Sequence, residues 1–341
     1  MAHHPYARLH SCEPPRHFMI DHSSQEVTTK DARQMEIAFR HIANAIMKQS
    51  KLDISLIRIS NVTDDTFHVS LEARASNTGP VSATISPMTL KLCGPKGSFG
   101  VMTLPELVTG LGGTPITIDN QLVEITDTEA LQAFIQPIIK TRGATLSLKT
   151  GCASIHVPAF GILPRLIYYE RDVPLAGMCG LEVTIITATI TPPSHRRPLS
   201  PRRSSSCASN ASSSRMGITV IVRVKNPSPV ELSFGVCDFE LRNEEGEVFA
   251  ELKGGLDMRT QYFDITLLGT ADKRVAVGGQ ARLVGKSCAS GGWCSQTIRG
   301  IDVPIADMWK LLQVLDMQHG KPEPKIPSVS RWRGKFWKNC A

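Results

Sequence analysis

The chain has 341 residues, of which 41% are hydrophobic and 20% charged, so it is long enough for two domains that each bury a core. Its formal net charge is +7, but the excess of arginine and lysine is concentrated in residues 194–215 and 331–338, and the remainder is close to neutral. This distribution argues against a nucleic-acid-binding fold, which groups positive charge on one structured face. Because no run of about 18 apolar residues occurs, the sequence predicts no membrane-spanning helix.

One stretch of the chain occurs twice. Residues 69–100, moved on by 149 positions, fall on residues 218–249 without a gap. A repeat at this spacing indicates two similar domains, because solenoid repeats have periods of roughly 20–50 residues. The two copies are identical at six positions, where Arg74, Asn77, Pro80, Val81, Leu92 and Gly97 correspond to Arg223, Asn226, Pro229, Val230, Leu241 and Gly246.

The first copy is preceded by residues 1–30, which show no periodicity and predict a disordered tail. Residues 31–49 predict an amphipathic helix, which either closes one end of the first domain or lies on a membrane surface. Apolar residues then alternate from Leu52 onward, as is typical of half-buried strands. Strands are expected up to a turn at 61–65 and then at 67–75, 81–92, 99–104, 114–125, 144–148 and 153–157, with a further turn at 94–97.

One helix is expected within the first copy, after Asp127 as its cap, and Pro137 is expected to bend it or end it early. The tract 162–169 is expected to lead out of the first domain through Pro174.

The second copy begins with an expected strand at 181–190 and is then interrupted by the low-complexity residues 192–215, which replace the 61–65 turn of the first copy. The repeated strands follow with a closing turn at 243–246, and further strands are expected at 262–268 and 274–284. The Gly-rich loop 289–293 predicts a hairpin tip that packs the indole of Trp293. Pro304 is expected to start a last helix.

These elements predict a mainly-β fold with two tandem antiparallel β-sandwich domains of the immunoglobulin/fibronectin-like kind and a few accessory helices. The expected organisation is a disordered tail at 1–30, a first domain at 31–178, a second domain at 179–318 with a disordered Arg/Ser insertion at 192–215, and a basic-aromatic tail at 319–341.

The nine cysteines contain no C-x-x-C motif, and most interrupt apolar strands. Free cysteine behaves there as a small buried hydrophobe, so a reducing compartment is expected. Cys288 and Cys294 flank the Gly-rich loop, and whether they pair across it stays open.

No motif for nucleophilic catalysis, phosphate binding or metal binding is present, so we expect a protein that is not an enzyme and has no cofactor or metal site. His68 and His156 lie within expected strands, where a structural histidine is commoner than a catalytic one.

The turn residues Asn77, Pro80, Asn226, Pro227 and Pro229 are expected to shape the corners of the sandwiches. An asparagine side chain can bond to the backbone of the turn, and proline restricts φ before the next strand. We therefore expect these residues to have a structural role.

Two other groups of residues suggest contacts. An unconstrained solvated loop is the simpler interpretation of the insertion, and the alternative is that its serines beside arginine or before proline are phosphorylation sites. The aromatic and basic tail suits a membrane surface or an acidic partner, or is a disordered end. The candidate phosphosites are Ser200, Ser204 and Ser205, and the candidate contact residues are Trp332, Arg333, Lys335, Phe336 and Trp337.

The segment NPSPVELSFGVCDFELRNEEGEVFAEL, residues 226–252, resembles the strand, Asn-Pro turn and strand of the water-stress type of late embryogenesis abundant (LEA) domain. The first copy departs from this pattern at Thr78, where the proline is missing. The resemblance implies two LEA-like β-sandwich domains.

Residues 31–178 are more similar to a fungal family known only as a domain of unknown function. The similarity is carried by residues 52–61 with the following DDTF, by TGPVSATI and GSFGVMTLPEL, and by the Ala-Phe-Ile helix after Thr126. Members are associated with the vacuolar membrane, and at least one lineage is linked to turning autophagy off. They usually have a transmembrane helix before the first sandwich, whereas residues 1–30 are polar, so either a peripheral member or a missing N-terminal segment is implied.

The resemblance implies a non-catalytic interaction or structural module at the fungal vacuole membrane, whose partner is an unknown protein or the membrane surface. Two alternatives stay open. One is a soluble LEA-like stress-protective protein, for which the expected location is the cytoplasm. The other is a carrier of an apolar ligand between the sheets, which requires an internal cavity.

Overall fold

The structure is a computed structural model of the chain, and it describes residues 50–77, 82–110, 112–157, 161–191 and 215–316. Within these ranges the chain is built mainly from strands, so the predicted mainly-β fold is confirmed. The strands are β1 (Lys51–Ser60), β2 (Thr66–Ser76), β3 (Ala83–Ile85), β4 (Met88–Gly94), β5 (Gly97–Leu104), β6 (Leu107–Thr109), β7 (Thr114–Glu124), β8 (Gly143–Val157), β9 (Gly161–Ala176), β10 (Glu182–Ile190), β11 (Arg215–Asn226), β12 (Val230–Arg242), β13 (Val248–Met258), β14 (Gln261–Asp272), β15 (Arg282–Cys288) and β16 (Asp302–Ala306). The helices are α2 (Thr128–Lys140), α3 (Gly292–Ile298) and α4 (Trp309–Asp316).

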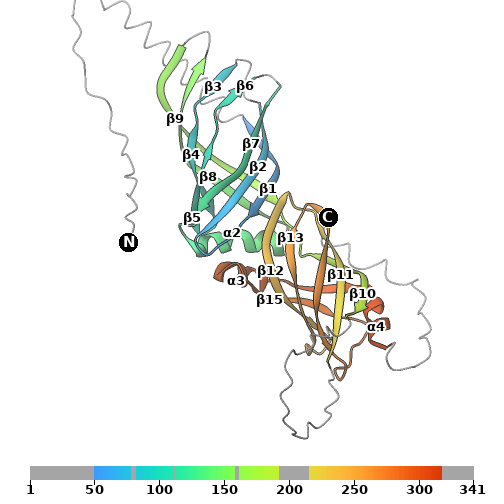
Figure 1. Cartoon of the computed structure of the whole chain (residues 1–341). Helices are drawn as coiled ribbons and strands as arrows, with labels where there is room; N and C mark the ends of the chain where they lie inside the picture. The colour runs from blue at the N-terminus through green and yellow to red at the C-terminus, as the bar shows by residue number, and fades with distance from the viewer. Residues whose placement is uncertain (1–49, 78–81, 111, 158–160, 192–214, 317–341) are drawn as a thin grey trace, which may run out of the picture. The chain divides into compact units, whose positions relative to one another are not determined.

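The first half of the described chain is a sandwich (Figure 1). Its strands β1, β2 and β7 are neighbours in one sheet, and β5, β4, β8, β3 and β6 form the other, with β9 paired to β8. The alternation of β2 buries Phe67, Val69 and Leu71 on one face. Helix α2 packs on this core, because the ring of Phe134 stacks on that of Phe99 with 5.1 Å between centroids.

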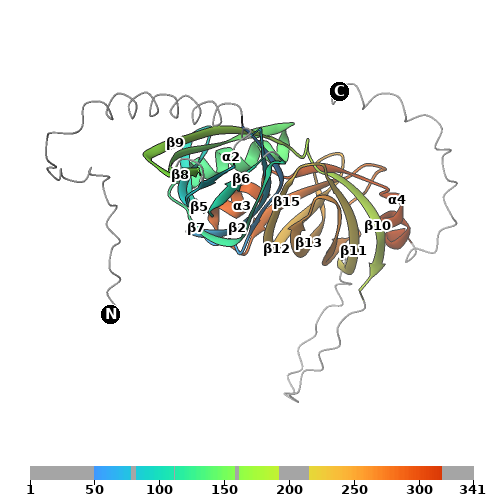
Figure 2. The same cartoon turned by 90° about the horizontal axis from the view of Figure 1, so that it is seen from above.

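The second half is a closed circuit of strands. The order β13-β14-β11-β10-β16-β15-β12 is completed by a further pairing between β12 and β13. Closure satisfies the backbone groups that an open sheet leaves at its edges. Figure 2, seen from above, shows the curved strands β12, β13 and β11 of this circuit, in which β14 pairs between β13 and β11.

The tandem repeat is reproduced in the strand pairing. Ala75 of β2 lies opposite Thr114 of β7, and Val224 of β11 lies opposite Phe263 of β14, which is the same pair moved on by the sequence offset. The two copies therefore share register as well as sequence pattern. This is the expected tandem arrangement.

Both halves share one ten-stranded sheet. Strand β1 pairs in parallel with β12, with Ile57 opposite Val230 and Ile59 opposite Leu232. The backbone N–H of Ile57 also donates to the carbonyl of Pro229 over 2.9 Å. The turn between β1 and β2 is held by the second half as well, because the Trp293 indole Nε1 donates to the Thr63 carbonyl over 2.8 Å. The division of the chain at residue 178 stays a prediction.

Several boundaries in the first half differ from expectation. The single strand expected at 81–92 is two strands, β3 and β4, because Pro87 between them has no N–H for a ladder bond. The two strands expected at 144–148 and 153–157 are one strand, β8, whose register shifts where Thr150 adopts a positive φ of 58°. The tract expected to lead out of the domain is strand β9, which pairs along β8.

The helix α2 begins after Asp127, whose side chain accepts a bond from the N–H of Ala130, as predicted. Of the two effects expected of Pro137, an early end is wrong, because the helix continues to Lys140, and a bend stays a prediction. Proline removes one donor, but the following Ile138 and Ile139 are buried at 0% and 3% exposure, and this packing holds the last turn.

Three expectations for the second half are wrong. Residues 274–281 are turn and coil, and strand β15 starts only at Arg282. The loop at 289–293 begins a short helix, α3, although its Trp293 is buried at 2% exposure as expected. Pro304 lies within strand β16, and the last helix starts at Trp309, because Ile305 pairs with Val183 of β10.

The expected tail at 1–30, the helix at 31–49, residues 192–214 of the insertion and the tail at 319–341 lie outside the described residues. Among the described residues, no helix is both long and apolar enough to cross a membrane.

Candidate functional site

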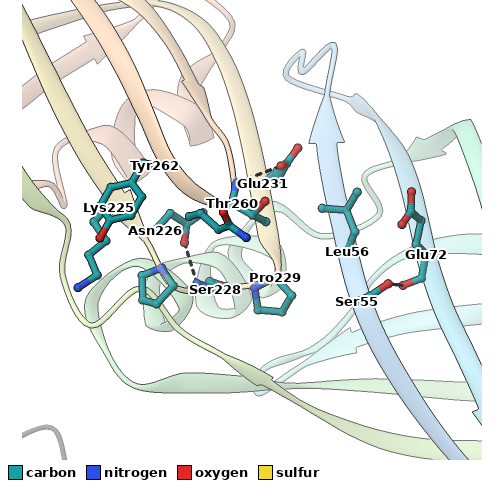
Figure 3. A pocket seen from close by; sticks show the side chains of 12 residues that line it. Ser55, Leu56, Glu72, Lys225, Asn226, Ser228, Pro229, Glu231, Thr260 and Tyr262 are labelled. Carbon is teal, nitrogen blue, oxygen red and sulfur yellow. Dashed lines mark hydrogen bonds between the residues drawn. The ribbon is translucent and has the colours of Figure 1, made fainter.

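The candidate site is an open groove of about 650 Å³ beside the parallel pairing of β1 with β12 (Figure 3). We call it the junction groove. One wall is formed by β1 and β2, and the other by the turn after β11 together with the turn before β14. It is lined by Ser55, Leu56, Glu72, Lys225, Asn226, Pro227, Ser228, Pro229, Glu231, Thr260, Gln261 and Tyr262.

The turn between β11 and β12 is held by the buried side chain of Asn226. Its Nδ2 donates to the carbonyls of Val230 and Arg259, each over 3.0 Å, and its Oδ1 accepts from the N–H of Ser228 over 2.9 Å. One side chain therefore joins this turn to the next hairpin turn. Side-chain bonds of this kind let a buried turn satisfy its backbone groups.

Ser228 extends the same network. Its Oγ accepts from the N–H of Val230 over 3.1 Å and donates to the carbonyl of Ala176, at the end of β9, over 2.6 Å. The turn is thereby tied to β9 as well as to β1. Asn226 and Ser228 are buried at 0% and 2% exposure, so they shape the groove without offering free polar atoms to it.

The carboxylate of Glu231 is buried at the groove wall and is fully paired. Its Oε2 lies 2.7 Å from Nη1 of Arg58, and its Oε1 accepts from the N–H of Thr260 over 3.0 Å. Arg58 also contacts Asp257 at 3.0 Å, and Asp257 contacts Arg259 at 2.8 Å. A buried carboxylate requires such partners, so we assign this cluster a structural role.

The exposed part of the groove is its rim. The ring of Tyr262 is 62% exposed and lies beside Lys225 (Figure 3). Pro227 is exposed as well, whereas Pro229 and Leu56 are half-buried. An aromatic ring, prolines and a leucine around a polar floor form a surface on which another chain can pack.

The backbone of β1 offers a second feature. Strand β2 pairs with β1 from Lys51 to Ser60, whereas β12 occupies the other edge of β1 only from Ile57 to Ile59. In the part of the chain that the structure describes, no strand pairs with that second edge over residues 51–56. This stretch ends at the junction groove, where Ser55 and Leu56 form part of the wall.

The groove has no arrangement typical of covalent catalysis among its serines. The hydroxyl of Ser55 donates to the carbonyl of Glu72 over 3.1 Å, and that of Ser228 donates to Ala176. Both hydroxyls therefore bond to backbone oxygens, whereas a nucleophilic serine is activated by a neighbouring base. Within the described ranges, no group of three or more His, Cys, Asp or Glu side chains has a geometry that could hold a metal ion.

The structure brings three of the predicted turn residues to the groove, namely Asn226, Pro227 and Pro229. Asn77 is exposed just after the end of β2, with a positive φ of 57°, and is not among the residues that line the groove. The other predicted residues lie outside the described part of the chain: Pro80, Ser200, Ser204, Ser205, Trp332, Arg333, Lys335, Phe336 and Trp337.

Sequence reasoning missed Arg58, Glu231 and Tyr262. The first two are 173 positions apart and meet only because β1 pairs with β12. Tyr262 follows the turn that Asn226 binds, and no local pattern marks it as a groove residue. The one available signal was the polar Glu231 within the apolar start of β12.

Comparison with protein families gives a match over part of the chain. A family model described as "Protein of unknown function (DUF3712)" matches residues 97–241, which run from β5 into β12 and cover less than half of the chain. A match to a family of unknown function was expected over residues 31–178; it is confirmed at 97–178, and the matched range continues beyond the expected one to 241. No curated protein matches the sequence.

Among solved structures, the chain is similar to the solution structure of a protein described as late embryogenesis abundant (LEA). The similarity covers 48% of this chain and 97% of that chain, with 12% sequence identity and a TM-score of 0.24.

Proposed function

We propose that this protein is a non-catalytic interaction module that binds an extended segment of a partner protein in the junction groove. The observation that carries the proposal is the stretch of β1 at residues 51–56, whose second edge has no paired strand among the described residues and which ends at the groove. An extended peptide added to such an edge gains main-chain hydrogen bonds, each with a net value of about 0.5–1.5 kcal/mol.

Specificity would come from the rim of the groove. A bound strand presents alternate side chains to the same face, and Tyr262, Pro227 and Leu56 supply apolar contact area there. The aromatic residue is the expected energetic centre, because tyrosine is enriched among the few residues that dominate binding. The groove is open to solvent, whereas a carrier of apolar ligands requires an internal cavity between the sheets, so the groove lends no support to that alternative.

A peptide library displayed on phage and selected against the purified full chain tests this proposal. We expect selection of extended sequences without a helical pattern, and a loss of affinity of about tenfold or more in Tyr262→Ala, since this corresponds to about 1.4 kcal/mol. Leu268→Ala is the matched control, because Leu268 lies on the same strand, β14, and is 53% exposed outside the groove.

Equal binding of the selected peptides to wild type and Tyr262→Ala would refute the groove as the binding site. An equal loss of affinity in Leu268→Ala would also refute the groove as the binding site, because the peptide would then contact a part of β14 outside the groove.

We further propose that the module works at the vacuole membrane, as the family resemblance implies, and that the basic-aromatic tail contributes the membrane contact. Imaging of a tagged full chain tests the location, and replacing Trp332, Phe336 and Trp337 by alanine tests the contact while keeping the cations. A vacuolar rim that becomes diffuse in this variant is expected. A diffuse signal from the wild-type chain would contradict the membrane assignment and leave the peptide-binding proposal unaffected.

A further inference from the structure

Three cysteine side chains from separate elements of the second half meet where β15 ends beside the middle of β12. Cys237 lies in β12, Cys288 is the last residue of β15, and Cys294 lies in α3. All three are free thiols, so the pairing of Cys288 with Cys294 that the sequence left open is not present. They are buried, at 0%, 9% and 0% exposure respectively. We call them the thiol cluster.

The backbone places two of these cysteines directly opposite each other. Cys237 and Cys288 are partners in the antiparallel pairing of β12 with β15. Beside them, the N–H of Ala289 donates to the carbonyl of Val236 over 3.0 Å. A ladder bond between the residues that flank a pair marks a non-hydrogen-bonded pair, in which the Cα atoms are about 4.5 Å apart and the side chains approach most closely.

This separation suits a disulfide without movement of either strand. Disulfides join Cα atoms at about 4.4–6.8 Å, with Cβ atoms at about 3.5–4.5 Å. No comparable backbone constraint links Cys294 to Cys288, because Cys294 is on a helix. The register therefore favours Cys237 as the partner of Cys288.

The surroundings of Cys288 favour its ionised form over that of its neighbours. Hydrogen bonds from Cys237 and Cys294 lower the pKa of Cys288, and the N–H of Ser290 also donates to its Sγ over 3.3 Å. The same contacts, with burial, raise the pKa values of Cys237 and Cys294. The charges of Asp238 and Asp64 raise those of Cys237 and Cys294 further.

Loss of the Cys288 proton leaves no buried carbonyl without a partner. As a thiol, Cys288 donates to the carbonyl of Phe234 over 3.1 Å. The hydroxyl of Ser290 donates to that same oxygen over 2.6 Å, so the carbonyl keeps a donor when the thiolate forms.

We propose that Cys237 and Cys288 are a site of reversible oxidation, at which hydrogen peroxide converts the two thiols to a disulfide between β12 and β15. The oxidant has to be small, because Cys288 is only 9% exposed and the other two sulfurs are fully covered. Hydrogen peroxide meets this requirement, whereas a bulky disulfide reagent does not.

The reaction balances in two steps. The Cys288 thiolate attacks one oxygen of hydrogen peroxide, the O–O bond breaks, and the leaving hydroxide takes a proton to become water, which leaves a sulfenic acid on Cys288. The sulfur of Cys237 then attacks the Cys288 sulfur as its S–H proton is lost, the S–OH bond breaks, and a second water leaves. Two thiols are oxidised, and one peroxide is reduced to two waters.

Mass spectrometry of the full chain tests this site. The reduced protein is exposed to increasing hydrogen peroxide, the remaining thiols are alkylated after denaturation, and the peptides are mapped. We expect a linked pair of peptides containing Cys237 and Cys288 that dithiothreitol separates. The link is expected to persist in Cys294→Ala and to be absent from Cys237→Ala, and Cys179, which is exposed, reports on the peroxide dose.

Two outcomes would overturn the proposal. One is a link between Cys288 and Cys294 in the wild-type chain. The other is a Cys288 thiol that remains fully alkylated at peroxide doses that have oxidised Cys179 completely. Both outcomes are measured on the folded wild-type protein, so the test does not depend on whether a variant folds.

Discussion

Replacing Asn226 by alanine should destabilise the protein strongly, because its side chain makes three hydrogen bonds while fully buried. The alanine variant leaves the carbonyls of Val230 and Arg259 and the N–H of Ser228 without these partners. Each buried polar group left alone costs about 1–3 kcal/mol. The adjoining groove is open and admits water to part of this turn, so we expect a total of about 3 kcal/mol, at the low end of the sum.

Urea unfolding followed by circular dichroism measures this effect. With a slope of about 3 kcal/mol per molar urea, the midpoint should fall by about 1 M. Lys225→Ala is the matched control from the neighbouring position, because Lys225 makes a surface ion pair with Glu182 at 3.4 Å, which contributes less than about 1 kcal/mol. Equal midpoints for the two variants would refute the view that Asn226 holds the two turns together.

Three further predictions concern packing and ionisation. Trp293→Ala should cost about 3–5 kcal/mol in urea unfolding, because the indole is buried at 2% exposure; an unchanged midpoint would mean that α3 is not packed as described. Gly285→Ala should lower the thermal midpoint, because its Cβ would overlap the backbone of α3, whereas Gly279→Ala meets no atom within 4 Å and should not; similar midpoints would contradict this difference. The pKa of Asp238 is lowered, chiefly by the hydrogen bond from Ser287, so its stabilising contribution is present above its unfolded pKa of about 3.9 and is lost as the pH falls through the folded value. Asp238→Asn should therefore weaken the dependence of stability on pH below about pH 4, and an unchanged acid titration would rule out this contribution.

Local sequence pattern was sufficient for much of the first sandwich. The alternation in β2 predicted its buried face, and Asp127 predicted the start of α2, because both depend on neighbours a few residues away. The structure extends the repeat beyond the matching sequence, because β11 pairs with β14 in the register in which β2 pairs with β7.

Local pattern failed where strand pairing decided the outcome. Residues 162–169 gave no clear signal for a strand, yet β9 forms because β8 offers a long edge for pairing. Pro304 is typical of a helix start, but Ile305 is held in β16 by Val183, which is more than 100 positions away. In the second case pairing with a distant strand outweighs the local propensity.

The sequence by itself determined the mainly-β class, the tandem repeat and the turn that Asn226 organises. Alternation, repetition and turn residues can each be recognised in the sequence without knowing which strands pair. Only the tertiary structure decided that β1 pairs with β12, that Arg58 neutralises Glu231 beside a groove, and that Cys237 faces Cys288. The physical reason is that strand pairing brings together residues whose separation in sequence carries no information about their partners. The proposed binding groove and the proposed oxidation site both depend on such pairings.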